Sequence, residues 1–230
     1  MRPKNKLNAE TFNNSHIFAR HDCKGKSKMI GVYTQNIDGV WFGVALREKA
    51  IVGSCFSANQ QATLSSLLPR IPYNEPFQVF VDPSAFAKKV LATLKKIYDG
   101  KDAGEEVALA MDGLPAYSQK VLAAALKIPV GYVTSYGAIA KAAGGGPRAV
   151  GNVMASNPFM PIVPCHRVVK SDFTLGGYGG GLKVKLELLG KEKRGYSSPK
   201  EVQVGGGQLE IFPVEYVLRK FPQCAWLRKS

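Results

Sequence analysis

The sequence of 230 residues has few cysteines, few histidines and no long apolar run. Its four cysteines form no CxxC pair, which argues against a zinc ribbon and against a thioredoxin-type redox site. No apolar stretch approaches the roughly 18–20 residues that a membrane-spanning helix needs. The N-terminus is basic but lacks the apolar segment of a secretory signal. We therefore expect a soluble intracellular protein with free thiols, cytoplasmic or, in a eukaryote, nuclear.

Acidic residues are also scarce, with 17 Asp and Glu against 31 Lys and Arg and a formal net charge of +14. The surplus is concentrated in residues 111–200, which contain 12 basic and four acidic residues. Such a surplus suits a polyanionic partner, most simply nucleic acid. Solubility alone would explain the same surplus, so composition leaves both interpretations open.

One group of metal-ligand types occurs near the N-terminus, where His16, His21 and Cys23 are close in sequence. Their spacing fits no standard zinc pattern. We interpret residues 1–25 as a loose extension and predict no metal site.

The first half of the chain, residues 1–110, is expected to be a strand-rich α/β domain. Segments rich in β-branched and aromatic residues predict an antiparallel meander of three strands: residues 29–35, 40–46 and 50–56. Helical spacing of apolar residues and flanking prolines predict two helices: Ser57 to Leu68 and Pro83 to Tyr98. Residues 100–113 are either a strand with polar flanks or a linker. We place the domain boundary near residue 110.

The second domain, residues 111–195, is expected to be mostly helical. Apolar periodicity, breakers and the N-cap candidate Ser135 predict four helices: Ala116 to Leu126, Tyr136 to Ala143, Arg148 to Ser156 and Leu182 to Glu192. The second and third are separated by three glycines, a shape typical of a helix-turn-helix. Any helical hairpin would satisfy the same pattern. Residues 196–230 form an extension of unknown role.

A stiff loop follows the third helix. Three prolines occur within seven residues before Cys165, so the backbone leading to this cysteine has little freedom. A glycine-rich segment, residues 176–181, allows a close backbone approach. In the last helix, Val184, Leu188 and Glu192 share a face, which places the carboxylate at the edge of an apolar stripe. Glu192 is either solvated there or paired with a buried partner, for which His166 is the obvious candidate.

Four segments of the second half point to one family: SYGAIAKAAG, PRAVGNVMASNP, IVPCHRVVKSD and GGYGGGLKVKLELLGKE. By their order and spacing, the chain resembles the O6-alkylguanine-DNA alkyltransferases, also called methylated-DNA–protein-cysteine methyltransferases. The resemblance covers about residues 115–192. It implies an α/β (α+β) fold, with an RNase H-like N-terminal domain followed by a helical domain with a helix-turn-helix.

The resemblance also implies the catalytic roles. Cys165 is the acceptor nucleophile, His166 takes its proton through a water molecule, and Glu192 orients His166. Asn157 braces the active-site loop. Tyr136 contacts the flipped guanine and a phosphate, and protonates the base.

DNA and base contacts follow from the same resemblance. Arg148 fills the space that the extruded base leaves in the duplex. Small residues on its helix allow close approach to a groove: Ala149, Gly151 and Ser156. Five residues line the base pocket: Met154, Met160, Val168, Tyr178 and Gly179. At Gly179 some members have Ser, so a side-chain hydroxyl is absent here.

The implied chemistry agrees with what these residue types can do. A free cysteine has a pKa of roughly 8.5, and a His–carboxylate pair can accept its proton and raise the thiolate fraction. A thioether has no route to hydrolysis, so one protein molecule repairs one lesion. We expect no cofactor and no metal. The expected partner of a monomer is duplex DNA containing alkylated guanine, with no membrane involved.

Two rival functions remain at this stage. A thiol hydrolase would use Cys165 and His166, but adjacent residues are an awkward nucleophile–base pair, and a hydrolase would turn over. A non-enzymatic protein that only binds damaged DNA would lack the acceptor cysteine.

Overall fold

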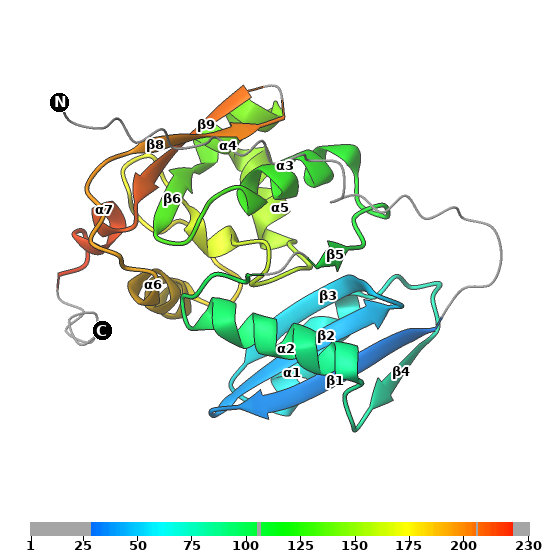
Figure 1. Ribbon diagram of the computed structural model, residues 1–230. Coiled ribbons are helices and arrows are strands. Elements are labelled where there is room, and N and C mark those ends of the chain that lie inside the picture. Colours follow the sequence, from blue (N-terminus) through cyan, green and yellow to red (C-terminus); the bar gives the residue numbers. More distant parts are fainter. Residues whose placement is uncertain (1–28, 105–106, 206, 223–230) are drawn as a thin grey trace, which may run out of the picture.

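The computed structural model describes residues 29–104, 107–205 and 207–222, which contain two β-sheets and seven α-helices (Figure 1). His16, His21, Cys23 and Cys224 lie outside the described residues. Within them, no helix combines the length and apolarity needed to cross a bilayer. The mixed α/β fold class predicted from the sequence is confirmed.

The first sheet has five strands in the order β4-β1-β2-β3-β5. Its members are β1 (Ile30–Ile37), β2 (Val40–Arg47), β3 (Ala50–Ser57), β4 (Phe77–Phe80) and β5 (Ala108–Leu109). The first three strands pair antiparallel, as the predicted meander requires, while β4 is parallel to β1 and β5 is parallel to β3. The segment 100–113 therefore contains a two-residue strand with polar flanks.

Helices cover both faces of this sheet: α1 (Gln60–Leu67), continued by the 3₁₀ turn η1 (Leu68–Arg70), and α2 (Ala85–Tyr98). Neighbouring residues of β2 point to opposite faces. Phe42 makes an edge contact with Tyr98 of α2, whereas a Cβ at Gly43 would meet Thr63 of α1. Both helices start slightly later than predicted because Asn59 and Ser84 act as N-caps, accepting hydrogen bonds from backbone N–H groups in the first turn.

The second half begins with α3 (Ala116–Leu126), β6 (Tyr132–Ser135), α4 (Tyr136–Ala143) and α5 (Pro147–Ala155). The hydroxyl of Ser135 accepts a hydrogen bond from the N–H of Ala138 at 3.0 Å, which confirms the predicted N-cap. Gly144 and Gly145 both have φ of 84°, a left-handed conformation that glycine adopts without steric cost. The chain thereby reverses between α4 and α5.

The remaining elements are η2 (Cys165–Arg167), β7 (Val168–Val169), α6 (Leu182–Lys191), β8 (Lys200–Val204), β9 (Gly207–Pro213) and α7 (Glu215–Leu218). Helices predominate over strands in residues 111–195, as expected, but β6 and β7 within that range join β8 and β9 in a four-stranded sheet, in the order β7-β6-β9-β8, that the sequence did not predict. The strands β6 and β7 are too short to show period-two patterning. Their partners β8 and β9 come from the extension that the sequence left uninterpreted.

The two halves share one apolar core, which runs from β1 through α2, α3 and α5 to β9. A smaller cluster lies between α6, α7 and β9. In Figure 1, α2 lies in front of the first sheet, and its end approaches α6. There Lys191 Nζ lies 3.4 Å from the ring centre of Tyr98. The boundary near residue 110 marks a change of sheet without a break in the core, and the division into two domains stays a prediction.

Candidate active site

Cys165 lies at the end of the proline-rich loop, as the first residue of η2. Its N–H donates to the carbonyl oxygen of Val163 at 2.8 Å, and its side chain is 6% exposed. Burial raises the pKa of the thiol. A hydrogen bond with the Asn157 side chain and the positive charge of Lys185 offset part of that rise. The sulfur is thus shielded from bulk water but faces groups that stabilise its thiolate.

His166 and Glu192 form the pair predicted from the sequence, and both side chains are buried. His166 Nε2 and Glu192 Oε1 are 2.9 Å apart. Burial alone would raise the pKa of Glu192, but the charge of Arg167 and the interactions with His166 outweigh it and hold the pKa at about 2. The carboxylate is therefore ionised and acts as the acceptor, so the Nε2 proton of His166 points toward it.

The other ring nitrogen of His166 is left free to accept a proton. Burial lowers the pKa of His166, which keeps the imidazole neutral at neutral pH. Its Nδ1 has no hydrogen-bond partner among the described residues. A neutral imidazole with Nε2–H bound to a carboxylate and a lone pair on Nδ1 is poised as a general base beside Cys165.

Arg167 completes a buried charge cluster to which the sequence analysis assigned no role. Its Nε donates to both carboxylate oxygens of Glu192, at 3.1 and 3.0 Å, and its Nη2 donates to Oε1 at 2.8 Å. Its Nη1 donates to the carbonyl oxygen of Ile128 at 2.6 Å. The sequence signal that could have revealed this role is the position of Arg167 directly after His166. If Glu192 is buried beside His166, a nearby positive charge is needed to keep the carboxylate ionised.

Lys185 is the second site residue that sequence reasoning missed. Its side chain is fully buried, and its Nζ donates to the carbonyl oxygens of Val168 at 2.6 Å and Gly177 at 3.2 Å, and to that of Leu175. Burial lowers its pKa to about 8. Lys185 lies four residues before the buried Leu189, a spacing that marked it as inward-facing. Leu182, the first residue of the same helix, is 53% exposed.

Asn157 and Tyr136 both form hydrogen bonds with the backbone of loops near Cys165. Asn157 Nδ2 donates to the carbonyl oxygen of Val163 at 2.9 Å, and Asn157 Oδ1 accepts from the N–H of Phe159 at 3.0 Å. The hydroxyl of Tyr136 donates to the carbonyl oxygen of Gly177 at 3.3 Å. Burial raises the pKa of Tyr136, and the charge of the Cys165 thiolate adds to the rise, so Tyr136 keeps its proton and can donate it.

The predicted pocket residues divide by exposure. Met154, Met160 and Val168 are buried and belong to the same apolar cluster as Cys165. Tyr178 is half-buried and Gly179 is exposed. The ammonium group of Lys185 binds carbonyl oxygens of Val168 and of the glycine-rich loop, and it lies near the ring of Tyr136.

The predicted DNA-contacting residues lie along α5. Arg148 near its start and Ser156 after its end are exposed, while Ala149 and Gly151 are half-buried. A Cβ at Gly151 would meet no atom within 4 Å, so the surface beside it is open. Exposed backbone and small side chains of α5 allow close approach of a partner. Arg148 supplies a positive charge at the N-terminal end of this helix.

No group of three His, Cys, Asp or Glu residues that could hold a metal occurs in the described part of the chain. There, Cys55 and Cys165 are free thiols. Burial raises the pKa of Cys55 to about 11, which makes it a poor nucleophile compared with a thiol that faces a general base.

Comparison with known proteins agrees with this geometry. Residues 116–194 match the family described as 6-O-methylguanine DNA methyltransferase, DNA binding domain. The structure of Mycobacterium tuberculosis OGT in complex with DNA superposes with a TM-score of 0.56 at 27% identity, covering 70% of this chain and 92% of that chain.

Two relatives by sequence carry the name methylated-DNA–protein-cysteine methyltransferase. The protein of Methanothermobacter thermautotrophicus is 37% identical over 111 residues, which span 48% of this chain and 63%, less than two thirds, of that relative. The protein of Mycobacterium leprae is 38% identical over 146 residues, 62% of this chain and 87% of that relative. The chain therefore belongs to the methylated-DNA–protein-cysteine methyltransferase family.

Proposed function

We propose that this protein repairs O6-alkylguanine in duplex DNA by moving the alkyl group to its own Cys165. The observation that carries the proposal is the buried Cys165 beside a neutral His166, whose Nε2 is bound to an ionised Glu192 and whose Nδ1 is unpartnered among the described residues. Relatives named for methyl transfer from DNA to a protein cysteine support the same assignment.

The reaction balances with the groups at hand. The thiol proton of Cys165 passes through a water molecule to His166 Nδ1, and the carboxylate of Glu192 stabilises the imidazolium. The thiolate sulfur attacks the alkyl carbon, so an S–C bond forms while the C–O6 bond breaks. The electron pair of the broken C–O6 bond stays on the guanine, which takes a proton from Tyr136, and the proton that His166 received returns through solvent to Tyr136. The products are guanine and S-alkylcysteine, and no metal or organic cofactor is needed.

The same geometry explains why we expect a single turnover. The thioether has no acidic proton for His166 to remove and no charged leaving group. The alkyl group also lies within a buried loop, out of contact with bulk water. Each protein molecule therefore accepts one alkyl group.

Access to the lesion requires a flipped nucleotide, because O6 is inside the base stack. We propose that α4 and α5 form a helix-turn-helix that docks on the DNA, with Arg148 entering the space of the flipped base. Phosphate contacts from the basic second half would supply affinity without sequence preference. The M. tuberculosis OGT–DNA complex supports this docking as an analogy.

The first sheet is proposed to be an RNase H-like layer, since three antiparallel strands are followed by a fourth strand parallel to the first. We propose a monomer as the active form, because one chain carries every group used in the reaction. The sheet contributes to the proposed chemistry through its hydrogen bonds with residues 157–165, which we call the acceptor loop.

Single-turnover transfer from a methylguanine duplex tests the proposed function. Wild-type protein should take up one methyl equivalent and then stop. Cys165→Ala should take up none while still binding the lesion-containing duplex. Continued turnover would instead indicate a hydrolase, and transfer by Cys165→Ala would show that another residue is the acceptor.

A further inference from the structure

The acceptor loop is bonded to the first sheet as well as to its own half of the molecule. The N–H of Ser54, in β3, donates to the carbonyl oxygen of Pro158 at 2.8 Å, and the Ser54 hydroxyl donates to that of Met160 at 3.0 Å. Ser54 and Phe159 form a parallel β-bridge, and both are fully buried. A residue more than a hundred positions before Cys165 thus extends the first sheet onto the acceptor loop.

Arg70 strengthens this junction from the end of η1. Its Nη1 donates to the carbonyl oxygen of Pro158 at 3.0 Å and to that of Ser54, and its Nη2 donates to the Ser66 hydroxyl at 3.3 Å. A single guanidinium therefore binds the strand and the loop at once. Its planar set of donors fixes their relative position better than one flexible contact would.

A short chain of hydrogen bonds leads from Phe159, which pairs with Ser54, to Cys165. The carbonyl oxygen of Phe159 accepts from the N–H of Val163 at 2.9 Å, and the carbonyl oxygen of Val163 accepts from the N–H of Cys165 at 2.8 Å. Asn157 Nδ2 donates to the same oxygen of Val163 at 2.9 Å. Prolines at three positions between Asn157 and Cys165 restrict the backbone, so a shift of the Ser54–Phe159 bridge would also move Cys165.

We infer that Ser54 and Arg70 are positioning residues of the transfer reaction, which hold the Pro158–Met160 segment and thereby aim Cys165 at the alkyl carbon. The inference rests on the proposed function and adds to it a role for the first half of the chain. Neither residue contacts the reacting atoms; both act through the loop.

The charge of Arg70 supplies a second, independent readout. Burial raises the pKa of the Cys165 thiol, and the positive charges of Lys185 and Arg70 lower it. Arg70 acts in the same sense on the pKa of Tyr178, which burial and the Cys165 thiolate raise. The groups that face the thiol are Asn157, Lys185, Arg70, Tyr136, Tyr178 and the neighbouring His166. Removing Arg70 alone leaves the others and should move the pH dependence of the reaction upward.

The test uses full-length protein and free O6-benzylguanine, a substrate that needs no DNA docking. Arg70→Met should slow the single-turnover rate by about tenfold to a hundredfold, since a misplacement of about 1 Å can cost a hundredfold. Ser54→Ala, which removes only the hydroxyl bond, should slow it by several-fold. Arg70→Lys, which restores the charge, should return the pH midpoint of the rate toward that of wild type, whereas Arg70→Met raises it.

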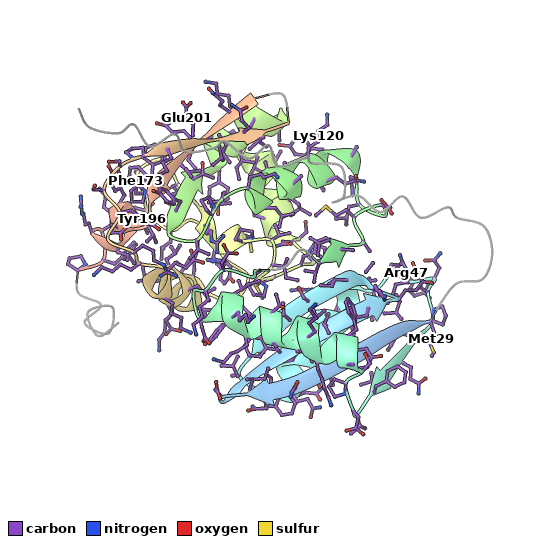
Figure 2. All side chains as sticks on the ribbon, in the orientation of Figure 1. Met29, Arg47, Lys120, Phe173, Tyr196 and Glu201 are labelled. Carbon is purple, nitrogen blue, oxygen red and sulfur yellow. The ribbon has the colours of Figure 1, made fainter. Side chains whose placement is uncertain are left out.

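Arg47→Met is the matched control. Arg47, the last residue of β2, is a partly buried arginine as Arg70 is, but its Nε donates to Glu75 Oε2 at 2.8 Å at one end of the first sheet (Figure 2). Its loss should leave the rate within about twofold and the pH midpoint unchanged. All variants are measured well below their melting temperatures, so that loss of folded protein does not enter the rates.

Two results would overturn the inference. One is an Arg70→Met protein with the wild-type rate and pH midpoint; the other is equal slowing of Arg70→Met and Arg47→Met, which would indicate a general loss of stability. A wild-type protein that takes no methyl group from a methylguanine duplex would contradict the proposed function itself, and this failure is seen before any variant is compared.

Discussion

At the scale of single residues, the chemistry depends on a cluster of charges in the interior. Glu192 is buried, yet four contacts within 3.1 Å, three from Arg167 and one from His166, keep it ionised. An unpaired carboxylate at that depth would take up a proton instead. The ionised state in turn fixes the tautomer of His166 and frees Nδ1 for the thiol proton. We therefore expect Arg167 to support the proposed base, because its charge helps to keep this carboxylate ionised.

Replacing Glu192 by Gln tests this arrangement. Without a carboxylate acceptor, the imidazolium loses its stabilisation, so the single-turnover rate should fall by about a hundredfold, a typical worth of general-base catalysis. Arg167 also loses its partner, which should lower the free energy of unfolding by about 3 kcal/mol. Glu187→Gln, on the same helix outside the cluster, should change neither quantity appreciably. Equal rates for the two variants would contradict the role of Glu192.

The same carboxylate makes a prediction about acid stability. Its pKa is about 2 in the folded protein and 4.5 for an unperturbed group, so the folded state favours the ionised form. The stabilisation from Glu192 is therefore fully present above about pH 4.5 and is lost as the pH falls toward about 2. Urea unfolding should show a steeper loss of stability over this range for wild type than for Glu192→Gln. Parallel curves would show that the carboxylate is not held ionised.

At the scale of elements, α5 carries the expected contact with the duplex. Arg148 lies at its exposed start, where the proposed docking would bring it against the duplex. Arg148→Ala should therefore slow repair in duplex DNA by at least about tenfold more than it slows reaction with free O6-benzylguanine. Lys88→Ala, an exposed cation of α2 outside the proposed docking helices, serves as the charge-matched control. Equal losses on both substrates would argue against insertion of Arg148.

The hairpin of β8 and β9 is a structural element of this chain with buried residues of its own. In β9, Leu209 and Ile211 are fully buried, whereas Glu210 between them is exposed. Ile211→Ala should lower the free energy of unfolding by about 2–5 kcal/mol, as large-to-small changes in a core do. Glu210→Ala, on the opposite face, should stay within about 0.5 kcal/mol. A hairpin that contributes nothing to stability would give the same value for both.

Local signals explain which elements were predictable. The helix from Tyr136 and its cap at Ser135 follow from short-range chemistry, and so does the meander of three strands. The pairing of Glu192 with His166 was also accessible, because helical periodicity placed the carboxylate at a buried edge and the family resemblance named its partner.

Contacts between distant segments were not accessible in this way. The binding of Ser54 and Arg70 to the acceptor loop joins residues about 90 to 105 positions apart, and nothing in either segment encodes it locally. The pairing of β6 with β9 has the same character. Lys185 was missed because a lysine is rarely buried, and only the carbonyl oxygens of two other segments, Val168 in β7 and the loop of Leu175 and Gly177, make that burial tolerable.

At the scale of the whole molecule, the two halves meet where the end of α2 approaches α6 (Figure 1), the helix that Glu192 follows. Gly100, after α2, has φ of 74°, and a Cβ there would lie 2.3 Å from the carbonyl oxygen of Lys191, the residue before Glu192. Arg194 donates to the carbonyl oxygen of Gly100 from the other side. The end of the first half thus packs against the segment that carries the carboxylate.

Gly100→Ala should disturb that junction. The matched control is Gly104→Ala, because Gly104 has φ of 72° and open space around its Cβ position. Both variants carry the cost of a left-handed alanine, about 1–2 kcal/mol, but only Gly100→Ala adds a clash with the backbone of Lys191. Gly100→Ala should therefore be the less stable protein and the slower one with O6-benzylguanine. Identical behaviour of the two variants in thermal unfolding would show that the halves are not coupled there.

The most direct measurement is peptide mapping by mass spectrometry after the protein has met an excess of methylguanine duplex. The account predicts one added methyl group per chain, located on the peptide that contains Cys165, with the peptide of Cys55 unmodified. A methyl group on any other residue, or a chain with no added mass although the duplex is bound, would contradict it.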